Sequence, residues 1–329
     1  MKSMGQTGFR NFHAGPDIAE QTLAAALRRW LAGQSWSDVR RLIEGRHVQV
    51  NGNLCTDTNR RLAATDVVKL WDHALAPPPL EKDVRIRYVD QHVVVVEKPA
   101  GMTTLRHPEE RHWPKRRRDL QPTLDEVLPR VVAACAPRPT RRKGPAPRLR
   151  AVHRLDRDTS GIMVFARTPQ AEQHLVQQFR KHTIHRAYLA IVHGDLRGQT
   201  IETQLVKDRG DGRRGSTANP KLGRRAVTHV RPVQQLDGYT LVECRLETGR
   251  THQIRIHLSE QGHMLCGEKV YDKPLRGERI QDDSGAPRLA LHAAELGFEH
   301  PLSGETLHFR SPLPHDLAEF LQRLQHRRK

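Results

Sequence analysis

The chain has 329 residues and a formal net charge of +18, which comes from 55 Lys and Arg against 37 Asp and Glu. This length fits about two ordinary domains, and a hydrophobic content of 36% excludes a collagen-like or fully disordered chain. No apolar run approaches the roughly 20 residues that span a bilayer, and the first twenty residues lack a hydrophobic signal segment, so we expect a cytoplasmic protein without membrane contact.

The excess of basic charge indicates a polyanionic partner, because clustered Lys and Arg attract phosphate groups. Only 15 residues are aromatic, which argues against a long channel that stacks single-stranded bases. A protein that is merely basic is the alternative. Nucleic acid is the favoured partner.

A first unit is predicted over residues 19–75. Apolar residues at helical spacing predict a first helix that carries Leu23, Leu27 and Leu31. A second helix is expected to begin at a Ser37 cap and to end at Gly45. Strands are expected at 47–50 and 66–70, and Asn51-Gly52 indicates a hairpin turn after the first of them.

Basic side chains gather on or beside these two helices: Arg28, Arg29, Arg40, Arg41 and Arg46. A solvated helix surface explains any one of them, but it is a weaker explanation for five beside two apolar stripes. The run from Ser37 to Gly52 resembles the alpha-L RNA-binding motif of a small-subunit ribosomal protein. The resemblance implies that the helices dock on structured RNA, with Arg40 and Arg41 among the contacts.

A stiff Pro-rich linker over residues 76–82 is expected to separate this unit from a second domain at 83–325. Within the second domain, residues 106–150 carry 13 Lys and Arg against 5 Asp and Glu. Only 123–132 looks helical there. We expect the flanks, such as 115–118 and 141–143, to be mobile basic arms, which either contact RNA or are a linker without a binding role.

The rest of the second domain alternates irregularly between strands and helices. Strands are expected at 84–88, 93–96, 161–167, 188–192, 227–233 and 239–246, and helices at 169–181, 251–261 and 316–325. This order predicts a strand-rich α+β domain with a mixed or antiparallel sheet, not a doubly wound one.

Several common motifs can be set aside. Gly210-Asp211-Gly212-Arg213-Arg214-Gly215 has the spacing of a dinucleotide loop, but turn-forming residues surround it and no helix is expected after it. Four widely spaced Cys argue against a zinc ribbon or a disulfide framework. Neither the pair His182 and His185 nor the pair His252 and His257 has a third ligand at metal spacing. We therefore expect no metal and no cofactor.

The most informative segment is His153-Arg154-Leu155-Asp156-Arg157-Asp158-Thr159-Ser160-Gly161, which runs into an apolar strand. Arginine on each side of Asp156 favours a charged carboxylate, as a nucleophile requires. A structural ion-pair network is the alternative from composition alone. A glycosidase that uses Asp156 and Asp158 as its carboxylate pair is disfavoured.

This segment resembles the signature of the RluA-type pseudouridine synthases. Four further blocks resemble that family and occur in its order: Lys98–Gly101, Arg186–Val192, Thr248–His257 and Arg288–Ala293. With the alpha-L motif, the resemblance covers most of the chain. It is closest to members that modify large-subunit ribosomal RNA.

The resemblance also implies roles for individual residues. Asp156 would attack the target uridine, either at the sixth ring carbon or at the anomeric carbon. Tyr188 would lie against the flipped base, and Arg255 would pair with Asp156. Arg154 would fill the gap in the RNA stack, and Leu289 or Leu291 would form an apolar wall. Further RNA contacts are expected from Arg157, Arg250 and His252.

We therefore expect an RNA pseudouridine synthase that acts on large-subunit (23S) ribosomal RNA as a monomer, without a cofactor or a protein partner. A transfer-RNA enzyme of the same chemistry is one alternative. A non-catalytic RNA-binding or ribosome-assembly factor is another, although binding alone needs none of Asp156, Tyr188 and Arg255.

Overall fold

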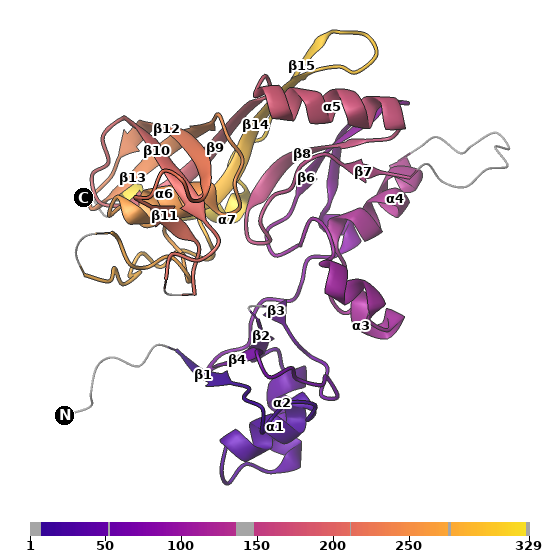
Figure 1. Cartoon of the computed structure of the whole chain (residues 1–329), viewed down its shortest axis with the longest axis vertical. Helices are drawn as coiled ribbons and strands as arrows, with labels where there is room; N and C mark the ends of the chain where they lie inside the picture. Colours follow the sequence, from indigo (N-terminus) through magenta and orange to yellow (C-terminus); the bar gives the residue numbers. More distant parts are fainter. Residues whose placement is uncertain (1–7, 52, 136–147, 211, 276–277, 327–329) are drawn as a thin grey trace, which may run out of the picture. The chain divides into compact units, whose positions relative to one another are not determined.

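The computed structural model describes residues 8–51, 53–135, 148–210, 212–275 and 278–326, and the chain divides into two compact units (Figure 1). The first unit contains the residues up to Pro78 together with His107–Pro122. The second contains Pro79–Arg106 and the residues from Thr123 onward. This division differs from the single insert at 106–150 that the composition suggests.

Two short helices form one side of the first unit, α1 (Leu23–Trp30) and α2 (Trp36–Glu44). Each buries an apolar face, as predicted, with Leu27 and Ile43 fully inside. The predicted cap of α2 is wrong by two residues. Ser35 is the cap, because its hydroxyl accepts from the amide of Asp38 while the Asp38 carboxylate accepts from the amide of Ser35.

An antiparallel sheet forms the other side, in the order β1 (Phe9–His13), β4 (Val67–Trp71), β2 (Val48–Val50) and β3 (Asn53–Leu54). The predicted hairpin is confirmed, since β2 pairs with β3 around Asn51 at φ +53°. The Asn51 side chain accepts from the amide of Val67 and donates to Asp66, so it ties the turn to the neighbouring strand.

Residues 107–122 form two short helical segments, the 3-10 helix η2 (Pro108–His112) and α3 (Lys115–Asp119). The expected mobile arm at 115–118 is therefore wrong, while the one at 141–143 lies outside the described residues. Trp113 connects this segment to the rest of the first unit. The Arg60 guanidinium lies 5.7 Å from its ring centre, and Arg60 in turn pairs with Asp66 at 3.5 Å.

The second unit is built on one mixed sheet. Its strands are β5 (Arg85–Val89), β6 (Val93–Lys98), β7 (Arg150–Ala151), β8 (Ser160–Ala166), β9 (His185–His193), β10 (Gln199–Val206), β11 (Gly215–Thr217), β12 (Arg224–Gln235), β13 (Tyr239–Leu246), β14 (Leu291–Glu299) and β15 (Thr306–Arg310). The order is β11-β10-β12-β13-β9-β14-β8-β6-β5, with β15 on β14 and β7 on β8. Among the described strands only β14 and β8 are parallel, so the predicted α+β class with a mixed sheet is confirmed.

Helices cover both faces of this sheet: α4 (Leu124–Cys135), α5 (Pro169–Lys181), α6 (Gln253–Glu260) and α7 (His315–His326), with a 3-10 turn η1 (Glu81–Asp83). Strand β8 is buried along its whole length. Its side chains alternate between two cores, with Ile162 and Val164 beside α5 and with Met163 and Phe165 in the core that includes α4. Figure 1 shows α5 lying across this part of the sheet.

Two further expectations can be compared with the structure. As expected, the described residues from 210 to 214 lead into a strand, β11, and not into a helix. No helix within the described residues is long and apolar enough to cross a membrane.

Candidate active site

A cavity of about 520 Å³ opens in the second unit, and most of the residues predicted from sequence line it. Six of the predicted site residues meet there: Arg154, Asp156, Tyr188, Arg250, His252 and Arg255. They come from the turn before β8, from strand β9 and from the start of α6. Leu291 also lines the cavity, whereas Leu289 is buried in the adjoining core.

The turn between β7 and β8 presents Asp156 to this cavity. Its neighbour Leu155 is buried and exchanges two hydrogen bonds with the Thr104 hydroxyl, at 2.8 Å and 3.2 Å. Gly161 has φ +122°, and a Cβ there would lie 2.2 Å from the carbonyl oxygen of Ala293. Only glycine therefore lets β8 approach β14 so closely just after the turn.

Lys98 stabilises the same turn through a hydrogen bond. Its side chain is almost fully buried, and its Nζ donates to the carbonyls of Pro99, Met102 and Arg157 at 2.8–3.0 Å. Burial lowers the pKa of Lys98 to about 7, although the charges of Asp158 and Asp156 oppose this shift. The bond to the Arg157 carbonyl links the Lys98–Gly101 block to the Asp156 turn.

Arg255 connects Asp156 to a residue that sequence analysis missed. Its Nη1 lies 3.8 Å from the Asp156 carboxylate, while Nε and Nη2 donate to Glu268 at 2.7 Å and 2.6 Å. Glu268 also accepts from the amides of Lys269 and Val270. Burial alone would lower the pKa of Arg255, but the hydrogen bonds and charge of Glu268 outweigh burial and raise it. The closest partner of Arg255 is thus Glu268.

Tyr188 lines the cavity from β9 and is 8% exposed. Its pKa is raised, mainly by burial and further by the negative charge of Asp156, while Arg186 acts in the opposite direction. The phenol is therefore protonated at neutral pH. Arg186, two residues before it on the same strand, donates to the carbonyls of Leu246 and Glu247 and lies over the Phe179 ring.

Two histidines flank the Asp156 turn. His252 begins α6 in a left-handed conformation, with Nε2 at 3.8 Å from Asp156 and Nδ1 at 2.7 Å from the Tyr271 hydroxyl. Burial lowers the pKa of His252, against the charge of Asp156. Burial also lowers the pKa of His153 to about 3, and its Nε2 accepts from the amide of Val164. Both rings are therefore neutral at pH 7.

Three predicted RNA contacts do not line this cavity. Arg157 turns toward Asp158, at 3.1 Å. Arg40 and Arg41 lie exposed on α2 in the first unit, where Arg41 pairs with Asp38 at 3.4 Å. Arg250 lines the cavity and also a second hollow beside it, together with Lys207, Arg214 and Arg224.

Comparison with known proteins identifies the family to which the chain belongs. Residues 92–260 match the model of the RNA pseudouridylate synthase family, and residues 21–68 match the S4 domain. The chain belongs to the RNA pseudouridylate synthase family. It is therefore an isomerase that converts uridine in RNA to pseudouridine, and it carries an RNA-binding S4 domain.

The similarity extends over most of the chain. Ribosomal large subunit pseudouridine synthase D of Zymomonas mobilis is 39% identical over 242 residues, which are 73% of this chain and 72% of that protein. An uncharacterized RNA pseudouridine synthase of Bacillus subtilis, YlyB, is 35% identical over 93% of this chain and 96% of its own. The human RNA pseudouridylate synthase domain containing 4 protein has the same fold, with a TM-score of 0.56 and 22% identity over 73% of this chain and 92% of its own.

Proposed function

We propose that this pseudouridine synthase acts on specific uridines of large-subunit ribosomal RNA, with Asp156 as its catalytic carboxylate. The names of several relatives, including those of Zymomonas mobilis and Nitrosomonas europaea, support the substrate. The observation that carries the site is the convergence of Asp156, Tyr188 and Arg255 on one cavity.

The reaction requires that the target nucleotide leave the RNA stack, at a cost of a few kcal/mol. The uracil base then enters the cavity beside Asp156. Attack by the carboxylate, at the sixth ring carbon or at the anomeric carbon, allows the bond between N1 and C1′ to break. The base turns, its fifth carbon bonds to C1′, and the bond between the carboxylate and the carbon that it attacked breaks, which frees Asp156. The proton lost from the fifth carbon is balanced by one gained at N1. No atom is added or removed.

Arg255 and Tyr188 have distinct parts in this proposal. Arg255 is held by two hydrogen bonds to Glu268, so that its remaining Nη1 faces Asp156. A cation fixed in this way stabilises the charged carboxylate. Tyr188 is a neutral phenol that contacts the flipped base and assists loss of the proton from its fifth carbon.

The RNA contacts follow from exposure and charge. Arg154 is exposed at the cavity and would fill the gap that the flipped base leaves. Arg250 and Arg157 would contact phosphates, and His252, being neutral, would hydrogen-bond to RNA or substrate. Arg40 and Arg41 on α2 would bind structured RNA through the domain at 19–75, which the linker at 76–82 joins to the catalytic domain at 83–325.

We also propose that the enzyme works in the cytoplasm as a monomer, without a protein partner. All the residues assigned to catalysis come from one chain. The four cysteines are free thiols, as is typical of a reducing compartment.

Mapping pseudouridine in total RNA, with and without this gene, tests the proposal. We expect a discrete large-subunit site to disappear and to return with the wild type but not with Asp156→Ala. Purified Asp156→Ala should still bind the RNA within a few-fold of the wild type. Loss at a transfer RNA would overturn the proposed substrate, and turnover by the variant would overturn the role of Asp156.

A further inference from the structure

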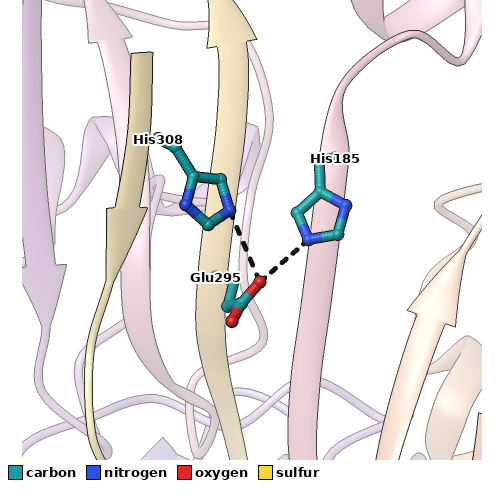
Figure 2. A group of neighbouring side chains, drawn as sticks. All are labelled: His185, Glu295 and His308. Carbon is teal, nitrogen blue, oxygen red and sulfur yellow. Dashed lines mark hydrogen bonds and ion pairs between the residues drawn. The ribbon is translucent and has the colours of Figure 1, made fainter.

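Two histidines and a glutamate meet on the sheet of the second unit, outside the catalytic cavity (Figure 2). His185 Nε2 lies 3.0 Å and His308 Nε2 lies 3.4 Å from the same oxygen of Glu295. One ligand atom from each residue lies within 4.8 Å of the other two. The sequence offered His185 no third ligand because its neighbours here are more than 100 residues away along the chain.

The pairing of three strands produces this cluster. His185 on β9 and His308 on β15 are both in register with Gly297 of β14, so the two rings flank a residue without a side chain. A Cβ at Gly297 would lie 3.0 Å from the His308 ring and 3.2 Å from the Cβ of His185. Glu295, two residues earlier on β14, points to the same face. Gly297 thus leaves the room in which the rings converge.

The carboxylate of Glu295 is oriented by Arg310. Its other oxygen, Oε1, forms an ion pair with Arg310 Nε at 3.1 Å, which leaves Oε2 turned toward both imidazoles. The side chain of Glu295 is 22% exposed and those of His185 and His308 are 37% and 38% exposed, so an ion can reach the site from solvent.

These donors suit a divalent transition-metal ion. Two imidazoles and one carboxylate form a known ligand set for Zn²⁺, with water in the fourth position. Bonds of about 2.0–2.2 Å place tetrahedral ligand atoms roughly 3.3 Å apart, which is close to the two distances measured from Glu295. Arg310 would hold the carboxylate as outer-shell partners of metal ligands commonly do.

We propose that His185, Glu295 and His308 bind Zn²⁺ and thereby link β9, β14 and β15. The site is distinct from the catalytic cavity. His185 and Arg186 are consecutive on β9 and so face opposite sides of the sheet, and Arg186 lines the cavity. The ion would fasten β15, whose strand pairing among the described residues is with β14 alone.

Binding of Zn²⁺ and Co²⁺ to the full chain tests this proposal, in a Cys135→Ser background that removes an exposed thiol. We expect one tight Zn²⁺ site per chain by calorimetry and a visible absorption band of tetrahedral Co²⁺. Glu295→Gln, which keeps the size of the side chain, and His308→Ala should both lose the tight site and the band. Zn²⁺ should raise the Tm of the parent protein but not of these variants.

His229→Ala is the matched control, because His229 pairs with Glu247 at 2.8 Å without a second histidine among the described neighbours. It should retain the site and the Co²⁺ band. Folding of every variant is checked by circular dichroism. The proposal is overturned if the parent protein gives no tetrahedral Co²⁺ band, or if folded Glu295→Gln binds Zn²⁺ as tightly as the parent.

Discussion

The pairing of Arg255 with Glu268 sets the position of the guanidinium that lies 3.8 Å from the Asp156 carboxylate. Both side chains are buried, and Glu268 is fixed in turn by two backbone amides. Arg255 therefore has little freedom to follow the carboxylate, so the geometry of the pair depends on a residue outside the cavity lining. Glu268 is a positioning residue in this scheme.

Replacing Glu268 with Gln tests this role. The amide keeps the shape but loses the charge and one of the two acceptors, so Arg255 should shift from Asp156. A misplacement of about 1 Å costs roughly 100-fold in rate. We expect kcat to fall by about that factor, with a much smaller change in KM, measured by tritium release from RNA labelled at the fifth uracil carbon.

Glu126→Gln is the control for Glu268→Gln. Glu126 also accepts two hydrogen bonds from an arginine, Arg106, but neither residue lines the cavity. Its replacement should leave kcat near the wild-type value. An equal loss of kcat in both variants would mean that Glu268 acts only through general stability.

Sequence predicted Asp156, Tyr188 and Arg255 because each lies in a motif block of a known family. Glu268 lies 13 residues beyond Arg255, in a stretch without regular periodicity, and nothing local indicates that the chain turns back there. The cluster of His185, Glu295 and His308 was also missed, because its residues come from three strands that are far apart in the sequence.

At the scale of secondary structure, the elements with clear end signals were predicted well. Helix α5 runs from Pro169 to Lys181 as expected, with the Thr168 side chain accepting from the amide of Ala171. Strands β1, β10 and β15 were missed, because their sequences are rich in polar residues and they expose many positions. Helix α3 was missed because a run of basic residues is also typical of an unstructured arm.

The start of α2 offers a test at this scale. Ser35→Ala removes the hydroxyl that accepts from the Asp38 amide, and a lost cap costs about 1 kcal/mol. We expect the free energy of unfolding of the first unit to fall by about that amount, measured by amide hydrogen exchange at the end of α2.

Ser37 provides the comparison for Ser35. It lies inside the first turn of α2, where its hydroxyl contacts that of Ser35 at 2.6 Å but caps no amide. Ser37→Ala should change the exchange rates much less. A larger effect from Ser37 than from Ser35 would contradict the observed cap.

At the scale of the whole molecule, the stability of the second unit should depend on pH through buried neutral histidines. Burial lowers the pKa of His153 to about 3 and the pKa values of His257 and His292 to about 4. The unfolded chain binds protons at these positions below about pH 6.5, whereas the folded chain does not. Stability is therefore greatest above pH 6.5 and falls as the pH drops toward 4.

We expect each of these histidines to make the free energy of unfolding fall by up to about 1.4 kcal/mol for each unit by which the pH is lowered. Urea unfolding between pH 7 and pH 5 measures it, in a range above the titration of most carboxylates. His153→Gln, which retains an acceptor for the Val164 amide, should reduce the slope. His326→Gln, at an exposed position on α7, should leave it unchanged, and a flat profile in the wild type would contradict the expectation.

The order of the two domains follows from the sequence, since the proline-rich stretch at 76–82 separates two different sets of motifs. The sequence does not indicate that residues 107–122 belong to the first unit. Contacts such as that between Trp113 and Arg60 join segments some fifty residues apart, and no periodicity in either segment indicates the other.

The inclusion of His107–Pro122 in the first unit makes the compact unit that contains the S4 domain discontinuous in the sequence. The backbone passes between the two units three times, after Pro78, Arg106 and Pro122. A transplant of residues up to Pro78 alone would leave behind Trp113 and the helical segment around it. Transfer of the whole unit to another protein therefore requires both separated pieces of this sequence.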